Sequence, residues 1–107
     1  MARESRFEQE LIQELMIRYP GAVILKNDSS FFQGIPDRLI LYGPNWAAFE
    51  VKSHPTAKHQ QNQDYYVDLF NRMSFATFVY PQNKEWFLNE IRKTLRPSRR
   101  ARGSLRI

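Results

Sequence analysis

GIPDRLILYGPNWAAFEVKS, residues 34–53, contains two short apolar runs joined by a tight turn. The Gly-Pro-Asn segment at 43–45 is typical of a β-hairpin turn, so we expect strands over residues 37–42 and 46–53. Charged residues interrupt this stretch, because Asp37 opens the first run and Glu50 and Lys52 lie within the second. Side chains alternate along a strand, which predicts Glu50 and Lys52 on one face, roughly 6.6 Å apart. An ordinary solvated strand face would explain this Glu-x-Lys triplet taken alone, and common turn chemistry would explain Asp37 after Pro36.

The remaining segments surround this hairpin with further helices and strands. Apolar residues recur at helical spacing over 5–19, and Pro20-Gly21 ends that helix. The pattern then predicts a strand over 22–26, a polar loop before the hairpin, a helix over 60–73, a strand over 75–80 and a helix over 83–96. The order α-β-β-β-α-β-α predicts an α/β fold in which helices flank a small mixed sheet on both sides.

Composition sets limits on the class of protein. The 107 residues suit one domain with one modest core, and 42% hydrophobic content excludes a disordered chain. The absence of cysteine excludes disulfides, thiolate metal sites and thiol catalysis. No apolar run approaches the roughly 20 residues that span a bilayer, and the first residues lack the apolar region of a signal peptide. We therefore expect a cytoplasmic protein with no membrane partner.

The net charge of +5 is concentrated at the end of the chain. Residues 1–90 carry nine Lys/Arg and eleven Asp/Glu, whereas residues 91–107 carry seven Lys/Arg and no acid. We therefore divide the chain into a folded domain over 1–96 and a basic, flexible tail over 97–107. Such a tail suits a polyanion such as nucleic acid, and a solubilising role is the alternative.

Two helices carry polar residues beside their apolar faces. Glu8 falls near the centre of the apolar arc of the first helix. A carboxylate buried without a partner costs several kcal/mol, so Glu8 either snorkels at the helix end or meets a cation. In the second long helix the apolar stripe, continued one turn back, reaches Asn62 and Gln63, whereas Gln61 points away. An amide in that position can reach a site at the edge of the sheet.

The loop residues allow more than one interpretation. His54 and His59 are expected to contact phosphate or to have no role, rather than to bind a metal. Phe31 and Phe32 are expected in the core, with a base-stacking role as the alternative.

Together, the ordered residues resemble the PD-(D/E)XK nuclease superfamily. GIPD at 34–37 is followed after twelve residues by EVK at 50–52; a helical Glu precedes this pair and a helix with Gln follows it. The pattern looks most like the VRR-NUC branch, which is close to archaeal-type Holliday-junction resolvases, and it covers about residues 5–80. The resemblance implies a restriction-endonuclease-like core and a Mg²⁺-dependent endonuclease acting on DNA, with Mn²⁺ able to substitute.

The resemblance also implies a role for each matching residue. Asp37 and Glu50 would bind the metal together with the backbone carbonyl of Val51, and Lys52 would be the catalytic lysine. Glu8 would bind through water or assist a second ion, and Gln63 would be the helical glutamine. Gln61 and Tyr65 fit a similar pattern, but the helix geometry favours Gln63. DNA contacts are expected from six residues, Ser29, Ser30, Lys58, Arg99, Arg100 and Arg102.

We expect branched or junction DNA as the substrate. The alternative is a non-catalytic DNA-binding or interaction protein of the same fold, and a restriction-like nuclease is less favoured because no recognition domain is visible. Paired cuts favour a homodimer. The last helix offers apolar residues on more than one face, namely Trp86, Phe87, Leu88, Ile91 and Leu95. One face would cover the sheet and the other a partner, unless the whole helix is buried.

Overall fold

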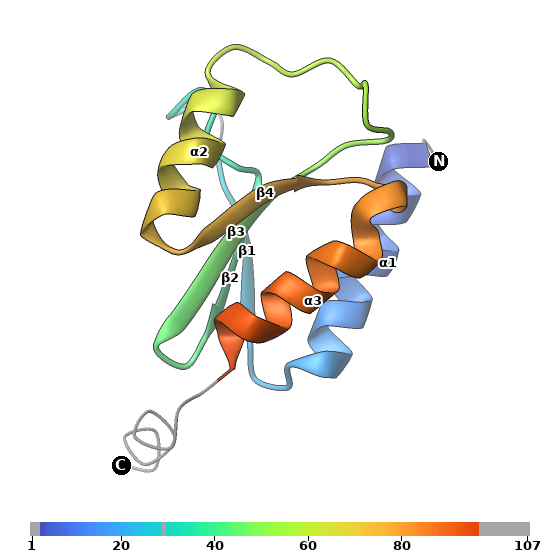
Figure 1. Ribbon diagram of the computed structural model, residues 1–107, viewed down its shortest axis with the longest axis vertical. Helices are drawn as coiled ribbons and strands as arrows, with labels where there is room; N and C mark the ends of the chain where they lie inside the picture. The colour runs from blue at the N-terminus through green and yellow to red at the C-terminus, as the bar shows by residue number, and fades with distance from the viewer. Residues whose placement is uncertain (1–2, 29, 97–107) are drawn as a thin grey trace.

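The computed structural model describes residues 3–28 and 30–96 of the chain (Figure 1). The three helices and four strands follow in the predicted order: α1 (Arg3–Arg18), β1 (Val23–Lys26), β2 (Arg38–Tyr42), β3 (Asn45–Val51), α2 (Gln63–Met73), β4 (Phe75–Val79) and α3 (Lys84–Leu95). A short 3₁₀ helix, η1 (Pro81–Asn83), precedes α3 and was not predicted. None of the helices in these ranges is long and apolar enough to cross a membrane.

The four strands form one mixed sheet in the order β1-β2-β3-β4. The first three strands run antiparallel to their neighbours, whereas β3 and β4 are parallel. The β2–β3 hairpin closes tightly because Tyr42 pairs with Asn45, and Gly43 between them has a φ of 59°. Parallel neighbours need a long crossover connection, and α2 supplies it between β3 and β4. The predicted α/β fold with a mixed sheet is confirmed.

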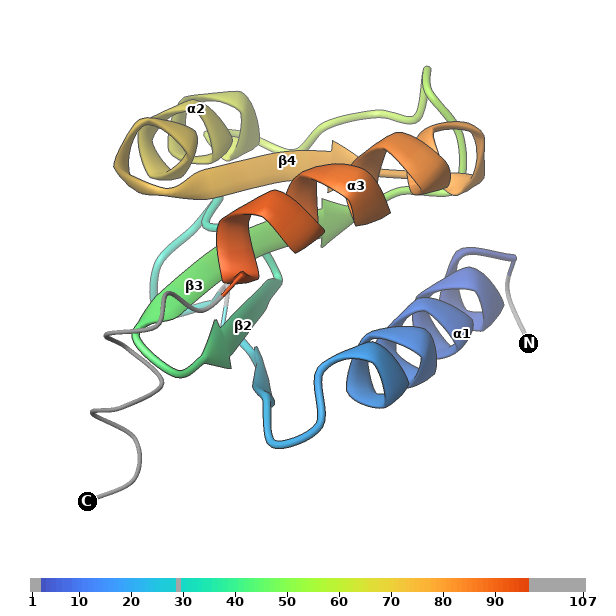
Figure 2. The same cartoon turned by 60° about the horizontal axis from the view of Figure 1, so that its bottom comes forward.

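Helices cover both faces of the sheet (Figure 2). Leu11 and Leu15 of α1 and four residues of α3 pack with Phe49 and its neighbours in the larger core cluster. The ring of Phe49 meets that of Phe87 edge to face, with centroids 5.1 Å apart. On the opposite face, Val67 of α2 packs against the small side chains of β3 and β4. This second face carries the polar residues described below.

The helix α3 lacks the outer apolar face that the sequence suggested. Phe87, Leu88, Ile91 and Leu95 are all buried within one chain. Only Trp86 is exposed, and its ring lies 5.9 Å from that of Phe75. The alternative of a helix buried within one chain is therefore favoured, because the sheet and α1 together bury all but one of these side chains.

Two other local expectations also need correction. β3 ends at Val51, so Lys52 lies beyond the strand rather than within it, and its side chain is buried. Phe31 and Phe32 are exposed rather than in the core. Three residues expected to contact DNA, Arg99, Arg100 and Arg102, lie outside the described residues, as does Ser29.

Candidate active site

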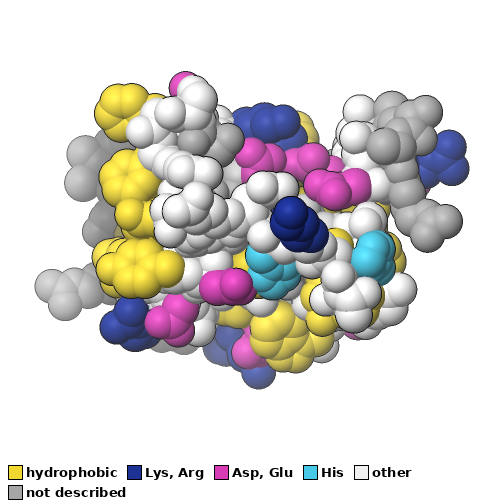
Figure 3. Space-filling view, turned by 90° about the horizontal axis from the view of Figure 1, so that it is seen from above, with side chains coloured by type: hydrophobic (Ala, Val, Ile, Leu, Met, Phe, Trp, Pro, Cys, Tyr) yellow, Lys and Arg dark blue, Asp and Glu magenta, His cyan; other side chains and the backbone are white. Residues whose placement is uncertain are grey.

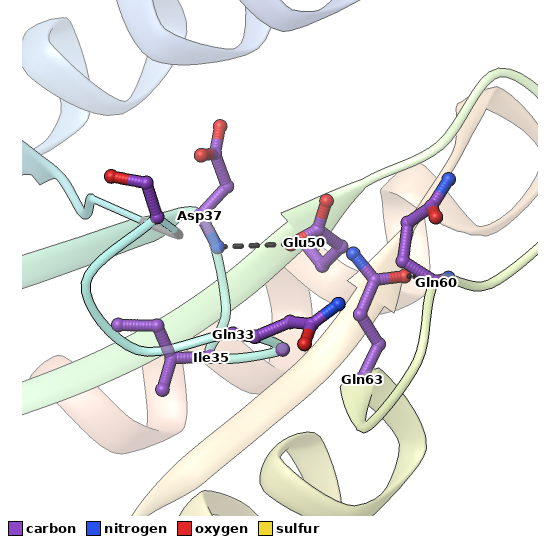
Figure 4. A pocket seen from close by; sticks show the side chains of 8 residues that line it. Gln33, Ile35, Asp37, Glu50, Gln60 and Gln63 are labelled. Atoms are coloured by element: carbon purple, nitrogen blue, oxygen red, sulfur yellow. Dashed lines mark hydrogen bonds between the residues drawn. The ribbon is translucent and has the colours of Figure 1, made fainter.

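A polar cavity of about 420 Å³ opens between the loop that precedes β2, the end of β3 and the start of α2 (Figure 4). Three of the five expected catalytic residues line it: Asp37, Glu50 and Gln63. The cavity is completed by Ser30, Gln33, Gly34, Ile35 and Gln60. The fold therefore brings together residues that are far apart in the sequence.

Hydrogen bonds at the neck of the loop fix where Asp37 enters the cavity. The Asn27 backbone N–H donates to the Asp37 carbonyl (2.7 Å), and the Asn27 side chain donates to the Pro36 carbonyl (2.7 Å). Gly34 lies within the loop at a φ of +96°, and a Cβ there would stand only 2.6 Å from the Cβ of Asn62. Glycine at position 34 thus allows the loop to touch the start of α2.

Asp37 and Glu50 are joined directly. The Asp37 backbone N–H donates to Glu50 Oε1 at 3.0 Å. Burial, with a smaller contribution from the charge of Asp37, raises the pKa of Glu50 to about 7 against the opposing effects of the Asp37 N–H and Lys52. Burial also raises the pKa of Asp37, with a smaller contribution from Glu8. A cation placed between these carboxyl groups would offset both effects.

Gln63 is the first residue of α2 and is buried. Its side-chain oxygen accepts a hydrogen bond from the Gln60 backbone N–H at 2.8 Å. This bond turns the amide nitrogen toward Glu50, as Figure 4 shows. Gln63 can therefore donate to a carboxylate or to a ligand oxygen in the cavity.

Glu8 meets a cation, which was one of the two expectations for it. Arg38 Nε lies 2.8 Å from Glu8 Oε2, and the two side chains are only 20% and 16% exposed. Glu8 does not line the cavity. Arg38 was not among the residues predicted from the sequence, because an arginine next to a turn has no local signature.

Lys52 does not line the cavity. Its Nζ donates to the backbone carbonyl of Lys58 at 3.1 Å, and the residue is 7% exposed. Its charge still reaches Glu50, because it lowers the pKa of that carboxyl against the effect of burial. The ammonium thus favours the ionised form of Glu50.

The remaining expected contacts lie around the cavity. Ser30 lines the cavity, and its N–H and hydroxyl both donate to Asp28 Oδ1, at 2.9 and 2.6 Å. Lys58 is exposed. His59 stacks on Phe78 with ring centroids 3.9 Å apart, and its Nδ1 lies 2.7 Å from Asp64. His54 bonds to Thr56.

The donor set suits a hard cation that retains much of its water. Within residues 3–28 and 30–96, no group of three or more His, Cys, Asp or Glu gathers as a closed metal site. Asp37 and Glu50 nevertheless present carboxylate oxygens in one cavity, and both carry raised pKa values. Mg²⁺ is held by one or two carboxylates with several waters in many proteins. The residues present therefore fit Mg²⁺ bound through few protein atoms.

Figure 3 shows acidic side chains side by side on the end of the molecule at which β3 finishes, with basic and histidine side chains nearby.

Comparisons of this chain with protein-family models, with curated proteins and with solved structures find no match. The geometry of the site and the sequence pattern consequently carry the functional argument.

Proposed function

We propose that this protein is a metal-dependent endonuclease that hydrolyses DNA phosphodiester bonds at the Asp37–Glu50 cavity. The observation that carries the proposal is the hydrogen bond from the Asp37 backbone N–H to the Glu50 carboxylate, which holds both acidic residues at one open polar cavity. Burial raises the pKa values of both carboxyl groups, and a bound cation would lower them again. The resemblance to PD-(D/E)XK nucleases, and to the VRR-NUC branch in particular, gives the same two residues the metal-binding role on a restriction-endonuclease-like core.

Asp37 and Glu50 would hold Mg²⁺, with the backbone carbonyl of Val51 as a further oxygen. When bound, Mg²⁺ supplies the positive charge that phosphodiester hydrolysis requires at the phosphate. Gln63 would donate its amide N–H to Glu50 or to a phosphate oxygen, since its own oxygen is already occupied by Gln60. Arg38 would act as a positioning residue that holds Glu8 beside Asp37.

Lys52 would act first through its charge. By favouring the ionised form of Glu50, it keeps that carboxylate able to bind a cation at neutral pH. A direct contact between Lys52 and the substrate would require its Nζ to leave the Lys58 carbonyl. The loop over 53–59, which supplies that carbonyl, would then have to change its conformation on binding.

The alternative function is a non-catalytic DNA-binding protein. It is favoured by one observation, that Lys52 does not line the cavity. Both functions use the same surface for DNA, so only a measurement of strand cleavage separates them.

The decisive experiment incubates the full chain with duplex, flap, fork and four-way junction DNA. Each substrate is tested with Mg²⁺, with Ca²⁺ and with EDTA. We expect cleavage with Mg²⁺ only, fastest on a branched substrate. Asp37→Asn and Glu50→Gln should each lower the rate at least about 100-fold, since each removes a charge that holds the metal. Both variants should bind DNA as the wild type does.

Glu85→Gln is the matched control, because Glu85 is an exposed acid in the first turn of α3. It should cleave at the wild-type rate. DNA binding by the wild type without cleavage of any substrate would support the alternative function instead. Full activity of Glu50→Gln would contradict the assignment of the site.

A further inference from the structure

The two edges of the sheet differ in how their backbone groups are bonded. The β4 edge is capped by side chains of the same chain. Asn71 Oδ1 accepts from the Ala76 N–H at 3.1 Å, and Asn83 Nδ2 donates to the Phe78 carbonyl at 3.0 Å. The oxygen of that amide, Asn83 Oδ1, accepts from the Tyr80 N–H at 2.8 Å. These contacts leave little of the β4 edge free to pair with another strand.

The β1 edge carries no such caps. The Asn27 N–H donates to the Asp37 carbonyl across the β1–β2 ladder. Because the direction of backbone groups alternates along an antiparallel strand, the N–H and C=O of Ile24 and Lys26 point away from β2. Within the described part of the chain, no side-chain hydrogen bond reaches these outward groups. Bare edges of this kind are templates for strand pairing.

Apolar side chains flank the bare edge on the face that carries α2. Val23 is 50% exposed and Leu25 is 42% exposed. Val23 pairs with Leu41 of β2, which is also exposed because α2 covers β3 and β4 rather than β1. Three exposed aliphatic residues thus lie together at one edge of the sheet.

On the other face of the sheet, α1 adds a fourth apolar side chain. The ion pair between Glu14 and Lys84 (2.8 Å) turns one flank of α1 toward α3. Met16 follows two positions later, about 200° around the helix, so it lies on the flank that points away from α3. Met16 is thus an exposed apolar residue on the flank of α1 that points away from α3.

We propose that β1 pairs antiparallel with β1 of a second copy of this chain, about a two-fold axis at Ile24. The outward N–H and C=O of Ile24 would then bond to the same groups of Ile24 in the second copy. In that register Val23 lies opposite Leu25 of the second copy, and Lys26 lies opposite Ala22, so that no two lysines meet. A single surface is thereby complementary to itself, as a closed dimer requires.

The test measures the molar mass of the full chain by light scattering, without DNA or metal, so its result is independent of the proposed chemistry. The wild type should have twice the 12.8 kDa mass of one chain at micromolar concentration. The double variant Val23→Lys/Leu25→Lys places lysine opposite lysine twice and removes the apolar contact. Its dissociation constant should rise by about 100-fold, leaving a monomer.

The double variant Val23→Lys/Leu25→Glu is the matched partner of that experiment. It carries the same loss of apolar surface, but each lysine now lies opposite a glutamate. It should remain dimeric, which would establish both the edge and the register. Trp86→Lys should also remain dimeric, because Trp86 lies on α3. Circular dichroism checks that each variant keeps its fold.

Four results would overturn the proposal. The first is a monomeric wild type, and the second is a dimer that survives the Lys/Lys variant. The third is a Lys/Glu variant that dissociates as readily as the Lys/Lys variant, because opposite charges would then not face one another. Dissociation by Trp86→Lys alone would place the interface on α3 and would equally contradict pairing through β1.

Discussion

At the scale of single residues, the candidate site combines two carboxyl groups, those of Asp37 and Glu50, whose pKa values are raised by burial. Asp37 and Glu50 were predicted from the spacing of GIPD and EVK together with the flanking helices, because an ordinary turn or strand face would explain each of them alone. Arg38 was not found, because an arginine next to a turn has no local signature. The orientation of Lys52 could not be predicted either, since it depends on where the carbonyl of Lys58 comes to lie.

The raised pKa of Glu50 predicts how the stability of the metal-free protein depends on pH. Its folded-state pKa of about 7 exceeds the ordinary value of 4.5, so the folded state binds protons more tightly than the unfolded state between these values. The free energy of unfolding should therefore rise as pH falls through 7, reach its full gain below 4.5, and be lost again as pH rises.

Thermal melts in EDTA should show this as an increase of about 5 °C in Tm between pH 8 and pH 5. In Glu50→Gln the group that titrates is absent, so its Tm should change less over the same interval. If the Tm of Glu50→Gln depended on pH as that of the wild type does, the pKa of Glu50 would not be raised in the folded protein. At pH 8, Mg²⁺ should raise the Tm of the wild type more than that of Glu50→Gln.

Phe31 carries a second prediction at this scale. It is 86% exposed on the loop that contributes Ser30 and Gln33 to the cavity. An exposed ring beside a proposed DNA site can stack on an unpaired base, a contact of about 1–3 kcal/mol. Phe31→Ala should therefore weaken binding to single-stranded or junction DNA about 10-fold and leave duplex binding nearly unchanged.

Fluorescence anisotropy with labelled oligonucleotides measures this difference. Trp86→Ala, which removes an exposed ring on α3, is the control and should bind all substrates as the wild type does. Equal loss of affinity for duplex and junction DNA in Phe31→Ala would argue against stacking.

At the scale of elements, most helices and strands follow from local patterns. The hairpin was predictable because alternation and a Gly-Pro turn are properties of neighbouring residues. The end of β3 was not, since it depends on where Val51 pairs with Val79 of β4. The burial of α3 likewise depends on how the sheet and α1 surround it, and η1 has only three residues. Long-range packing therefore decided the features that the sequence left open.

The contact between the Gly34 loop and α2 allows a prediction about stability. Gly34→Ala would adopt an unfavourable φ and bring its Cβ against Asn62. Gly21→Ala would have a similar φ of +89°, but no atom lies within 4 Å of its added Cβ. We expect Gly21→Ala to lower the free energy of unfolding by about 1 kcal/mol and Gly34→Ala by about 3 kcal/mol.

Urea denaturation of the two variants separates backbone strain from the steric clash. The difference between them reports on the clash alone, because the strain is common to both. Equal destabilisation would mean that the loop and the start of α2 do not touch in solution.

At the scale of the whole molecule, acidic and basic residues are concentrated in different parts of the chain. The described residues carry the acidic site, whereas the basic residues over 97–107 extend beyond them. In the proposed function, the basic tail would bind DNA first. The cavity would then hold Mg²⁺ and cleave the bound strand. Neither role can be read from the composition of the chain as a whole, because a net charge averages the two parts.

Removal of residues 97–107 should weaken DNA binding without changing the thermal stability of the folded part. It deletes Arg99, Arg100, Arg102 and Arg106. If all four contact phosphates, the slope of log K against log salt concentration should fall by about 3.6 on duplex DNA. Binding titrations between 50 and 200 mM salt measure the slope, and an unchanged value would show that the tail does not contact DNA.

The hairpin that joins Asp37 to Glu50 also limits how this sequence can diverge. The Asp37 N–H reaches the Glu50 carboxylate because a two-residue turn sets the register between β2 and β3. Adding or deleting one residue within β3, between Trp46 and Glu50, would reverse the faces of the strand and turn the carboxylate toward the ring of Phe87. Substitutions in this segment can be tolerated one at a time, whereas a change in its length would remove both the acid pair and the core at once. Descendants of this chain should therefore vary in length at their loops and keep the spacing of thirteen positions between the two acids.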